Sequence, residues 1–137
     1  MNIIICTDDN NGMLFNHRRQ SQDKKVCEYI LNLVSLSSCN LWMNSYTKKQ
    51  FKENNENHII VDENFLDKVP KNDYCFVENT DITPYIDKIE KIILFKWNRV
   101  YPTDTFLPID LSTWTLEVSE EFIGYSHEKI TKEIYHK

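Results

Sequence analysis

The sequence predicts an α/β fold with a mainly parallel central sheet, flanking helices, and antiparallel strands at the C-terminal edge. In the first two thirds of the chain, short apolar runs alternate with helical segments, which is the pattern of strands joined by crossover helices. The last third carries strand patterns with no obvious helix between them. At 137 residues the chain has the length of one domain, residues 1–137, with one buried core.

Five apolar runs are expected to form the first strands of the sheet. Each is short, is rich in β-branched or aromatic residues, and is bounded by polar turn formers. They cover residues 2–6, 40–43, 58–62, 74–78 and 90–97.

The segments between these runs predict helices and loops. Residues 21–34 have apolar positions at helical spacing, with Ser21 as the expected N-cap and Asp23 in the first turn. A second helix is expected to begin at Asn44 or Ser45. The remaining connections are expected to be a polar loop at 14–21, a loop at 52–58, a turn or short helix at 63–72, and a helix start near Pro84.

In the C-terminal third, the sequence predicts one strand and leaves the last segment open between helix and strand. In residues 114–122 the apolar side chains Trp114, Leu116 and Val118 alternate with polar ones, which predicts a half-buried strand. Residues 127–137 contain two opposite-charge pairs at i,i+4 spacing, which favours a helix. The preceding strand needs a partner, which favours a strand, so local reasoning leaves both open.

Composition excludes several classes of function. The net charge of −5 argues against a surface for duplex nucleic acid, which normally carries a basic excess. No apolar run approaches the ~20 residues that cross a bilayer, and the first residues lack the basic start of a signal peptide. The four cysteines form no C-x-x-C pair and are expected to be reduced. We therefore expect a cytoplasmic protein that binds neither nucleic acid nor membrane.

Motifs for phosphate and metal binding are absent from the sequence. The chain has only two glycines, where an average composition would give about nine or ten, so a glycine-rich phosphate loop is excluded. The string that begins at His127 has threonine at position 131, so it does not match the H-E-x-x-H zinc pattern. No metal site is expected.

Three stretches of the sequence carry a resemblance to a known family. They are "IIICTDDNNGM" (3–13), "LWMNSYTKKQF" (41–51) and "KIEKIILFKWNRVYPTDTFLPIDLSTWTLEV" (88–118). In the order of its expected strands and helices, and in these motifs, the chain resembles dihydrofolate reductase over nearly its whole length. Met43 and Thr47 match the Met and Thr of that family's apolar-Met-Gly-Arg-x-Thr pattern. The resemblance implies the three-layer dihydrofolate-reductase-like fold, and it favours a strand at 127–137.

The sequence departs from the family at the cofactor site. The family's Gly-Gly pair after the fourth strand is replaced by Glu78 and Asn79, and a carboxylate there would repel a pyrophosphate. Acidic residues, Asp62 among them, stand where the family contacts the 2′-phosphate, and Ser45 stands in place of its arginine. The remnant of the cofactor site would comprise Asn44, Ser45, Tyr46, Asp62, Glu78, Asn79 and Thr80. We therefore expect the protein to bind no cofactor, and in particular not to bind NADPH in the family's usual mode.

On the substrate side, the resemblance assigns Asp23 to the acid that orients the pterin. The alternative is that Asp23 only stabilises a helix N-terminus. The substrate or ligand cleft would be lined by Cys6, Met43, Thr47 and Phe76. The basic cluster His17, Arg18 and Arg19 is either a solvated loop or a set of anion contacts over the cleft.

Two functions follow from these expectations. The first is a reductase-like scaffold that does not use NADPH in the usual way and binds a small molecule or a partner protein. The alternative is an active NADPH-dependent reductase of a pterin or related heterocycle, with an altered cofactor site and Asp23 as its acid.

Overall fold

The computed structural model describes residues 1–51 and 58–137. Most of the loop expected at 52–58 therefore lies outside the described residues. Within the described ranges, no helix is long and apolar enough to cross a membrane.

A seven-stranded sheet forms the centre of the molecule, in the order β5-β4-β6-β1-β7-β10-β9. The strands are β5 (Ile59–Val61), β4 (Leu41–Met43), β6 (Tyr74–Phe76), β1 (Asn2–Thr7), β7 (Lys91–Lys96), β10 (Ile130–His136) and β9 (Thr115–Phe122). The first five are parallel, and β10 and β9 are antiparallel to their neighbours. The predicted mixed sheet is confirmed, and so is the strand at the C-terminus.

Side chains alternate between the two faces of the sheet and feed two separate cores. On β1, Ile3 and Ile5 point into one cluster, whereas Ile4 points into the other. β7 shows the same alternation, with Leu94 in the first cluster and Phe95 in the second. The central strands are thus buried on both faces, as is typical of a parallel sheet.

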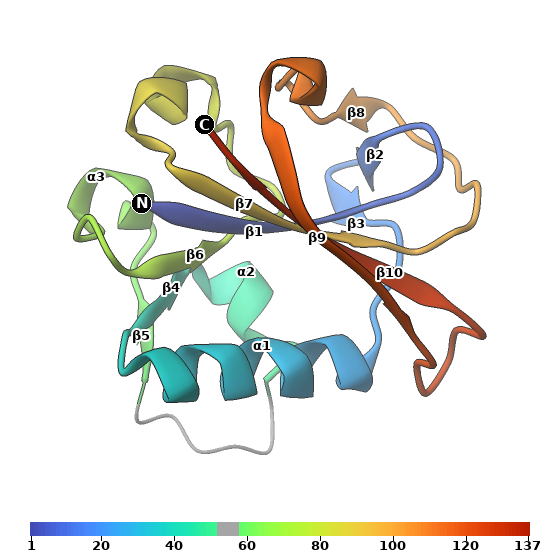
Figure 1. The fold of residues 1–137 in the computed structure, drawn as a ribbon, viewed down its shortest axis with the longest axis horizontal. Helices are drawn as coiled ribbons and strands as arrows, with labels where there is room; N and C mark the ends of the chain where they lie inside the picture. Colours follow the sequence, from blue (N-terminus) through green and yellow to red (C-terminus); the bar gives the residue numbers. More distant parts are fainter. Residues whose placement is uncertain (52–57) are drawn as a thin grey trace.

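Helix α1 (Lys24–Ser37) covers the second of these faces (Figure 1). Its buried side chains, Val26, Cys27, Ile30 and Val34, recur at helical spacing as predicted. The predicted start of the helix was wrong, because Asp23 rather than Ser21 is the N-cap. The Asp23 carboxylate accepts a 2.8 Å hydrogen bond from the backbone N–H of Lys25, so the side chain expected in the first turn closes the helix end instead.

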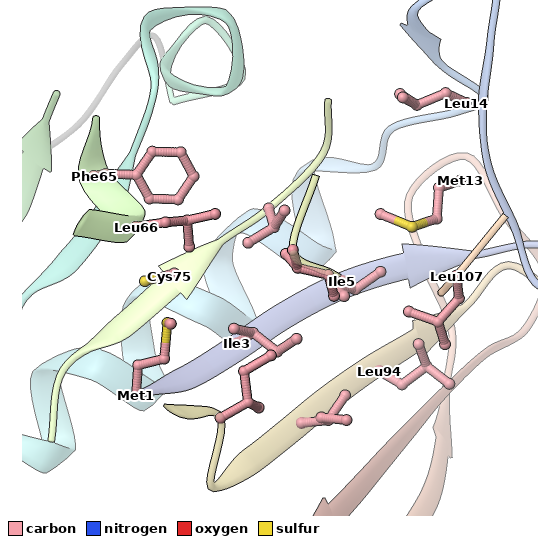
Figure 2. Close-up of a cluster of buried hydrophobic side chains, with 14 residues drawn as sticks. Met1, Ile3, Ile5, Met13, Leu14, Phe65, Leu66, Cys75, Leu94 and Leu107 are labelled. Carbon is pink, nitrogen blue, oxygen red and sulfur yellow. The ribbon is translucent and has the colours of Figure 1, made fainter. Parts of the chain in front are cut away.

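The opposite face is covered by short elements, which lie on the far side of the sheet from α1 (Figure 1). They are α3 (Phe65–Lys68), the 3₁₀ helices η1 (Thr83–Lys88) and η2 (Leu111–Thr113), and a small sheet of β3 (Arg18–Arg19), β2 (Gly12–Phe15) and β8 (Thr105–Phe106). Figure 2 shows Met13 and Leu14 of β2 in the same cluster as Ile5, Leu94 and Leu107.

The polar loop predicted at 14–21 is in fact the second half of a β-hairpin. Leu14 pairs with Arg19 across β2 and β3, and Asn16 and His17 form the turn with φ angles of 51° and 62°. Two consecutive left-handed residues are the mark of the tight hairpin turn whose twist matches the flanking strands. The hairpin also fixes the direction of Arg19.

Two further elements test the sequence predictions, and one of them departs from its prediction. Helix α2 (Ser45–Lys48) begins after Asn44, whose side chain accepts from the backbone N–H of Thr47 at 3.0 Å. β9, by contrast, is an edge strand that is mostly exposed, and Leu116 is 48% exposed. The expected apolar face is incomplete because a register shift opposite Ile134 and Tyr135 interrupts the alternation of side chains.

Candidate functional site

The site lies where parallel strands β1 and β6 end, which is where ligands bind in open α/β sheets. Glu78 follows β6 and is buried, with 8% of its side chain exposed. Arg19 reaches it from β3 and binds both carboxylate oxygens, with Nε–Oε2 at 2.9 Å and Nη2–Oε1 at 3.0 Å. The Thr47 hydroxyl donates to Oε1 at 2.9 Å. Arg19, a predicted anion contact, Thr47, a predicted cleft residue, and Glu78, a predicted residue of the remnant cofactor site, therefore form one bonded group.

Arg19 is held in place by Tyr46 as well as by Glu78. Its Nη2 donates to the backbone carbonyl of Tyr46 at 3.1 Å, and its backbone N–H donates to the Tyr46 hydroxyl at 3.0 Å. The guanidinium carbon lies 4.2 Å from the centre of the Tyr46 ring. Burial alone would lower the pKa of Arg19, but the hydrogen bonds and charge of Glu78 outweigh burial and raise it.

Little space remains inside this arrangement. A cavity of about 10 Å³ lies beside the ion pair and has room for roughly one water. Its lining is Cys6, Met13, Arg19, Gln20, Ser21, Val77, Glu78 and Trp97. Burial, with the Glu78 charge second, raises the pKa of the Cys6 thiol well above its usual range.

A larger groove runs along the outer side of the hairpin. Its volume is about 460 Å³, and it is lined by Phe15, Asn16, Arg18, Arg19, Gln20, Tyr101 and Pro102. Arg18 is exposed and forms no ion pair within the described part of the chain. Two of the three predicted anion contacts, Arg18 and Arg19, thus line one groove, and His17 sits at the exposed hairpin turn.

The residues expected in the remnant cofactor site bond to one another. The Asn44 side-chain amide donates to Asn79 at 2.8 Å and to the Thr80 hydroxyl at 3.4 Å, which ties the end of β4 to the end of β6. At the start of α2, the backbone N–H of Ser45 donates to the Glu63 carboxylate at 2.9 Å. The donor that a phosphate could use is therefore already occupied.

Asp62 is engaged beside this group. Its carboxylate lies 2.7 Å from Nζ of Lys68. That hydrogen bond, followed by one from the backbone N–H of Asn64, lowers the pKa of Asp62. Two other predicted cleft residues, Met43 and Phe76, are fully buried in the core beneath α1 and line neither the cavity nor the groove.

Asp23 is the most heavily bonded of the predicted site residues. Besides capping α1, it accepts from the backbone N–H groups of Tyr125 at 3.0 Å and Ser126 at 2.9 Å. Its Oδ2 also lies 2.9 Å from Nδ1 of His127. Burial alone would raise the pKa of Asp23, but these bonds, that of His127 first, hold it well below its usual range.

His127 connects Asp23 to two hydroxyl groups. Ser21 was expected only as a helix cap, and Tyr101 was not singled out by sequence analysis. Nε2 of His127 lies 2.9 Å from the Ser21 hydroxyl and 3.2 Å from that of Tyr101. The ring stacks on Trp97, with centroids 4.6 Å apart. No local pattern announces this group, because Ser21 and His127 are 106 positions apart.

Asp8 is a second residue that sequence analysis missed. One of its oxygens accepts from the backbone N–H groups of Asn10 and Gly12, and the other accepts from Gln20 and from the backbone N–H of Tyr101. Burial would raise the pKa of Asp8, but these bonds together lower it. Asp8 thus fixes both the hairpin and the rim of the groove. The turn formers at 7–12 were the one signal that could have suggested this role.

Comparison with solved structures gives a clear neighbour. A structure titled dihydrofolate reductase from Enterococcus faecalis, complexed with NADP(H) and RAB-propyl, matches with a TM-score of 0.63. The match covers 98% of this chain and 94% of that chain, at 11% sequence identity. The chain has a dihydrofolate-reductase-like fold. At this identity the likeness concerns the dihydrofolate-reductase-like fold alone. No family model and no curated protein matches the chain.

The described residues offer no group of three or more His, Cys, Asp or Glu side chains that could hold a metal ion. The candidate chemistry rests on three features. They are the closed Arg19–Glu78 pair, the open groove beside it, and the hydrogen-bonded chain from Asp23 through His127 to Ser21.

Proposed function

We propose that this protein is a dihydrofolate-reductase-like scaffold that does not use NADPH in the usual mode and binds a small anionic ligand. The single observation that carries the proposal is the position of Glu78, whose buried carboxylate is bonded by Arg19 and Thr47 at the end of β6. A carboxylate at this strand end has the wrong charge for a bound phosphate.

Opening the site for a dinucleotide would be costly. Moving Arg19 away would leave the buried Glu78 carboxylate without its partner, which typically costs about 3–5 kcal/mol. That is similar to the whole binding free energy of a ligand with a dissociation constant of ~1 mM, about 4 kcal/mol. At the neighbouring helix, Glu63 already accepts the backbone N–H of Ser45.

The groove supports the binding half of the proposal. Its volume of about 460 Å³ lies in the range of typical small-molecule sites, roughly 300–1,000 Å³. Phe15 and Tyr101 offer flat apolar surfaces, and the exposed guanidinium of Arg18 offers a bidentate partner for a carboxylate or phosphate. These features favour a small ligand that combines a flat ring with an anionic group.

The reductase alternative rests on Asp23, Met43 and Thr47, and the contacts of Asp23 do not support it. Both oxygens of Asp23 already accept hydrogen bonds from the chain itself, from Lys25 and Tyr125 on one side and from Ser126 and His127 on the other. A substrate would have to displace these partners in order to use the carboxylate.

The proposal is tested by thermal unfolding with three added probes: NADPH, dihydrofolate and phenyl phosphate. A ligand at 100 times its dissociation constant adds about 2.7 kcal/mol, which raises the melting temperature by several degrees. We expect a rise with phenyl phosphate and none with NADPH or dihydrofolate. The Arg18→Gln variant should lose the rise. Arg99→Gln, which removes an exposed arginine outside the groove lining, should keep it.

Two outcomes would contradict the two halves of the proposal separately. A clear rise with NADPH, together with oxidation of NADPH in the presence of dihydrofolate, would overturn the loss of cofactor use. A rise with phenyl phosphate that Arg18→Gln leaves intact, or no rise at all, would overturn the assignment of the groove.

A further inference from the structure

We propose that Ser21, His127 and Asp23 form a nucleophilic relay, with Ser21 as the nucleophile that hydrolyses short acyl esters. The three side chains are connected by two hydrogen bonds of 2.9 Å each, Ser21 Oγ to His127 Nε2 and His127 Nδ1 to Asp23 Oδ2. This is the arrangement by which serine hydrolases on unrelated folds activate a hydroxyl, and it is defined by geometry and not by sequence order.

The surroundings assign the protons in this relay. Nδ1 of His127 faces the Asp23 carboxylate, so it carries the ring proton, and Nε2 is left as the acceptor for a hydroxyl. Stacking on Trp97 and almost complete burial of the imidazole fix the plane of the ring. The backbone N–H groups of Tyr125 and Ser126 hold the carboxylate in turn. The base is therefore oriented and its tautomer is set.

Ser21 differs from its partners in being only half-buried and in lining the cavity of about 10 Å³. Arg19 lines the same cavity, and its Nη1 makes no hydrogen bond within the described ranges. A cavity of this size accepts one carbonyl oxygen. The Glu78 carboxylate lines the cavity as well and offsets the charge of Arg19, so what the cavity offers to that oxygen is the unbonded Nη1 group as a hydrogen-bond donor. The same small volume leaves no room for a long acyl chain beside that oxygen.

A second hydroxyl, that of Tyr101, also approaches His127 Nε2, at the longer distance of 3.2 Å. Tyr101 lines the groove, whereas Ser21 lines the cavity beside Arg19. We assign Ser21 as the nucleophile because it has the shorter hydrogen bond and lines the cavity that holds the unbonded Nη1 donor of Arg19.

The reaction is a balanced acyl transfer to water. Ser21 Oγ forms a bond to the carbonyl carbon of the ester while its proton passes to His127 Nε2. The bond from that carbon to the alcohol oxygen then breaks, and Nε2 returns the proton to the departing alcohol. Water attacks the acyl-serine and gives a proton to Nε2, and Ser21 leaves with that proton. One ester and one water become one carboxylic acid and one alcohol.

The alcohol part of the substrate would lie in the groove, which shares Arg19 and Gln20 with the cavity. This substrate class rests on the proposed function of the groove, and it predicts a short acyl ester of an aromatic, anionic alcohol. The assignment of the nucleophile stands apart from the groove. The first probe is therefore a small fluorophosphonate, which reacts with activated serines and needs no substrate recognition.

The experiment compares covalent labelling of wild type, Ser21→Ala and Ser112→Ala, with the modified peptide identified by mass spectrometry. Ser112 is the matched control because its exposed hydroxyl donates to Asp110 and lines neither the cavity nor the groove. We expect one adduct per chain, on Ser21, absent from Ser21→Ala and kept within about twofold in Ser112→Ala. Hydrolysis of p-nitrophenyl acetate should likewise be lost in Ser21→Ala and kept within about twofold in the control.

Each alternative outcome overturns the assignment. Failure to label the folded wild type, or an adduct on Tyr101 or Ser126, would show that the hydrogen-bonded chain is structural. Melting curves of Ser21→Ala serve as the control for folding. We expect a folded protein, since the substitution removes a single half-buried hydroxyl. If labelling of Ser21 succeeds and phenyl phosphate does not protect it, the nucleophile stands and the groove assignment fails.

Discussion

The Arg19–Glu78 pair makes the sharpest prediction about stability. Replacing Arg19 by Met leaves the Glu78 carboxylate, whose side chain is 8% exposed, with the Thr47 hydroxyl as its hydrogen-bond donor. Removing one partner of a buried pair costs about 3–5 kcal/mol. Arg19 itself is 19% exposed, so water screens part of the interaction, and we expect the lower end, about 3 kcal/mol.

The double variant distinguishes an ion pair from ordinary packing. Replacing Arg19 and Glu78 together by Met leaves no unpaired charge, and replacing a buried pair by apolar residues is often nearly neutral. The double variant should therefore be more stable than Arg19→Met alone, with a coupling free energy of about 2–3 kcal/mol. The assay is urea unfolding at neutral pH, extrapolated to water.

A matched cycle on the surface provides the control. Lys71 and Glu90 form an exposed pair at 3.7 Å, with side chains 76% and 53% exposed. Their coupling should stay below about 1 kcal/mol, as is usual for exposed pairs. The reasoning would be refuted if the loss of stability in the double variant equalled the sum of the losses in the Arg19 and Glu78 single variants to within about 0.5 kcal/mol. Substitutions at independent sites are additive to that extent.

Three further predictions concern other parts of the structure. Asp23→Asn should lower the free energy of unfolding at pH 7. Because the folded pKa of Asp23 is depressed, its stabilisation is complete above the unfolded value of about 4 and is lost as pH falls through the folded value, so melts of variant and wild type should converge in acid. Gly124→Ala should cost about 1–3 kcal/mol in urea unfolding, because the added Cβ would collide with Asp23 Oδ2; an unchanged midpoint would contradict this packing. Burial raises the pKa of Cys27 and of Cys75 to about 12, so both should resist a thiol reagent that labels Cys39 in the folded protein, and all should react in urea.

The sheet could be predicted because its signals are local. The apolar runs at 2–6, 74–78 and 90–97 are buried on both faces, and each alternates side chains between two cores. The cap at Asn44 could be predicted because its side-chain carbonyl accepts from the backbone N–H of Thr47, only three residues along the chain. At 127–137 the charge pairs favoured a helix and the need of the preceding strand for a partner favoured a strand, and only the resemblance to the dihydrofolate reductase family decided for the strand.

The site was less predictable because its contacts join distant segments. The sequence marked Glu78 as a foreign residue at a phosphate position and Arg19 as part of a basic cluster. Their pairing depends on the hairpin turn at Asn16 and His17, which directs Arg19 inward. A stretch read as a polar loop carried no sign of that turn, since Asn-His is not one of the sequences that strongly favour it.

The same limit applies to the proposed relay. Asp23 is predictable as a helix-end residue, but its bond to His127 spans 104 positions and forms only when β9 and β10 join the sheet. Sequence analysis tested His127 against a zinc motif and went no further. Residues that act together through tertiary contacts leave no spacing pattern along the chain.

The most direct test of the central claim is an NADPH titration by calorimetry, with the Enterococcus faecalis reductase measured under the same conditions. Our account holds that the crevice at the end of β6 keeps the shape of a nucleotide site while Glu78, Arg19 and Thr47 fill it. It predicts no saturable heat up to roughly 1 mM NADPH, the concentration at which even a 4 kcal/mol interaction half-fills its site. Saturable binding well below that concentration, weakened by changes at Asn44 or Asn79, would contradict it.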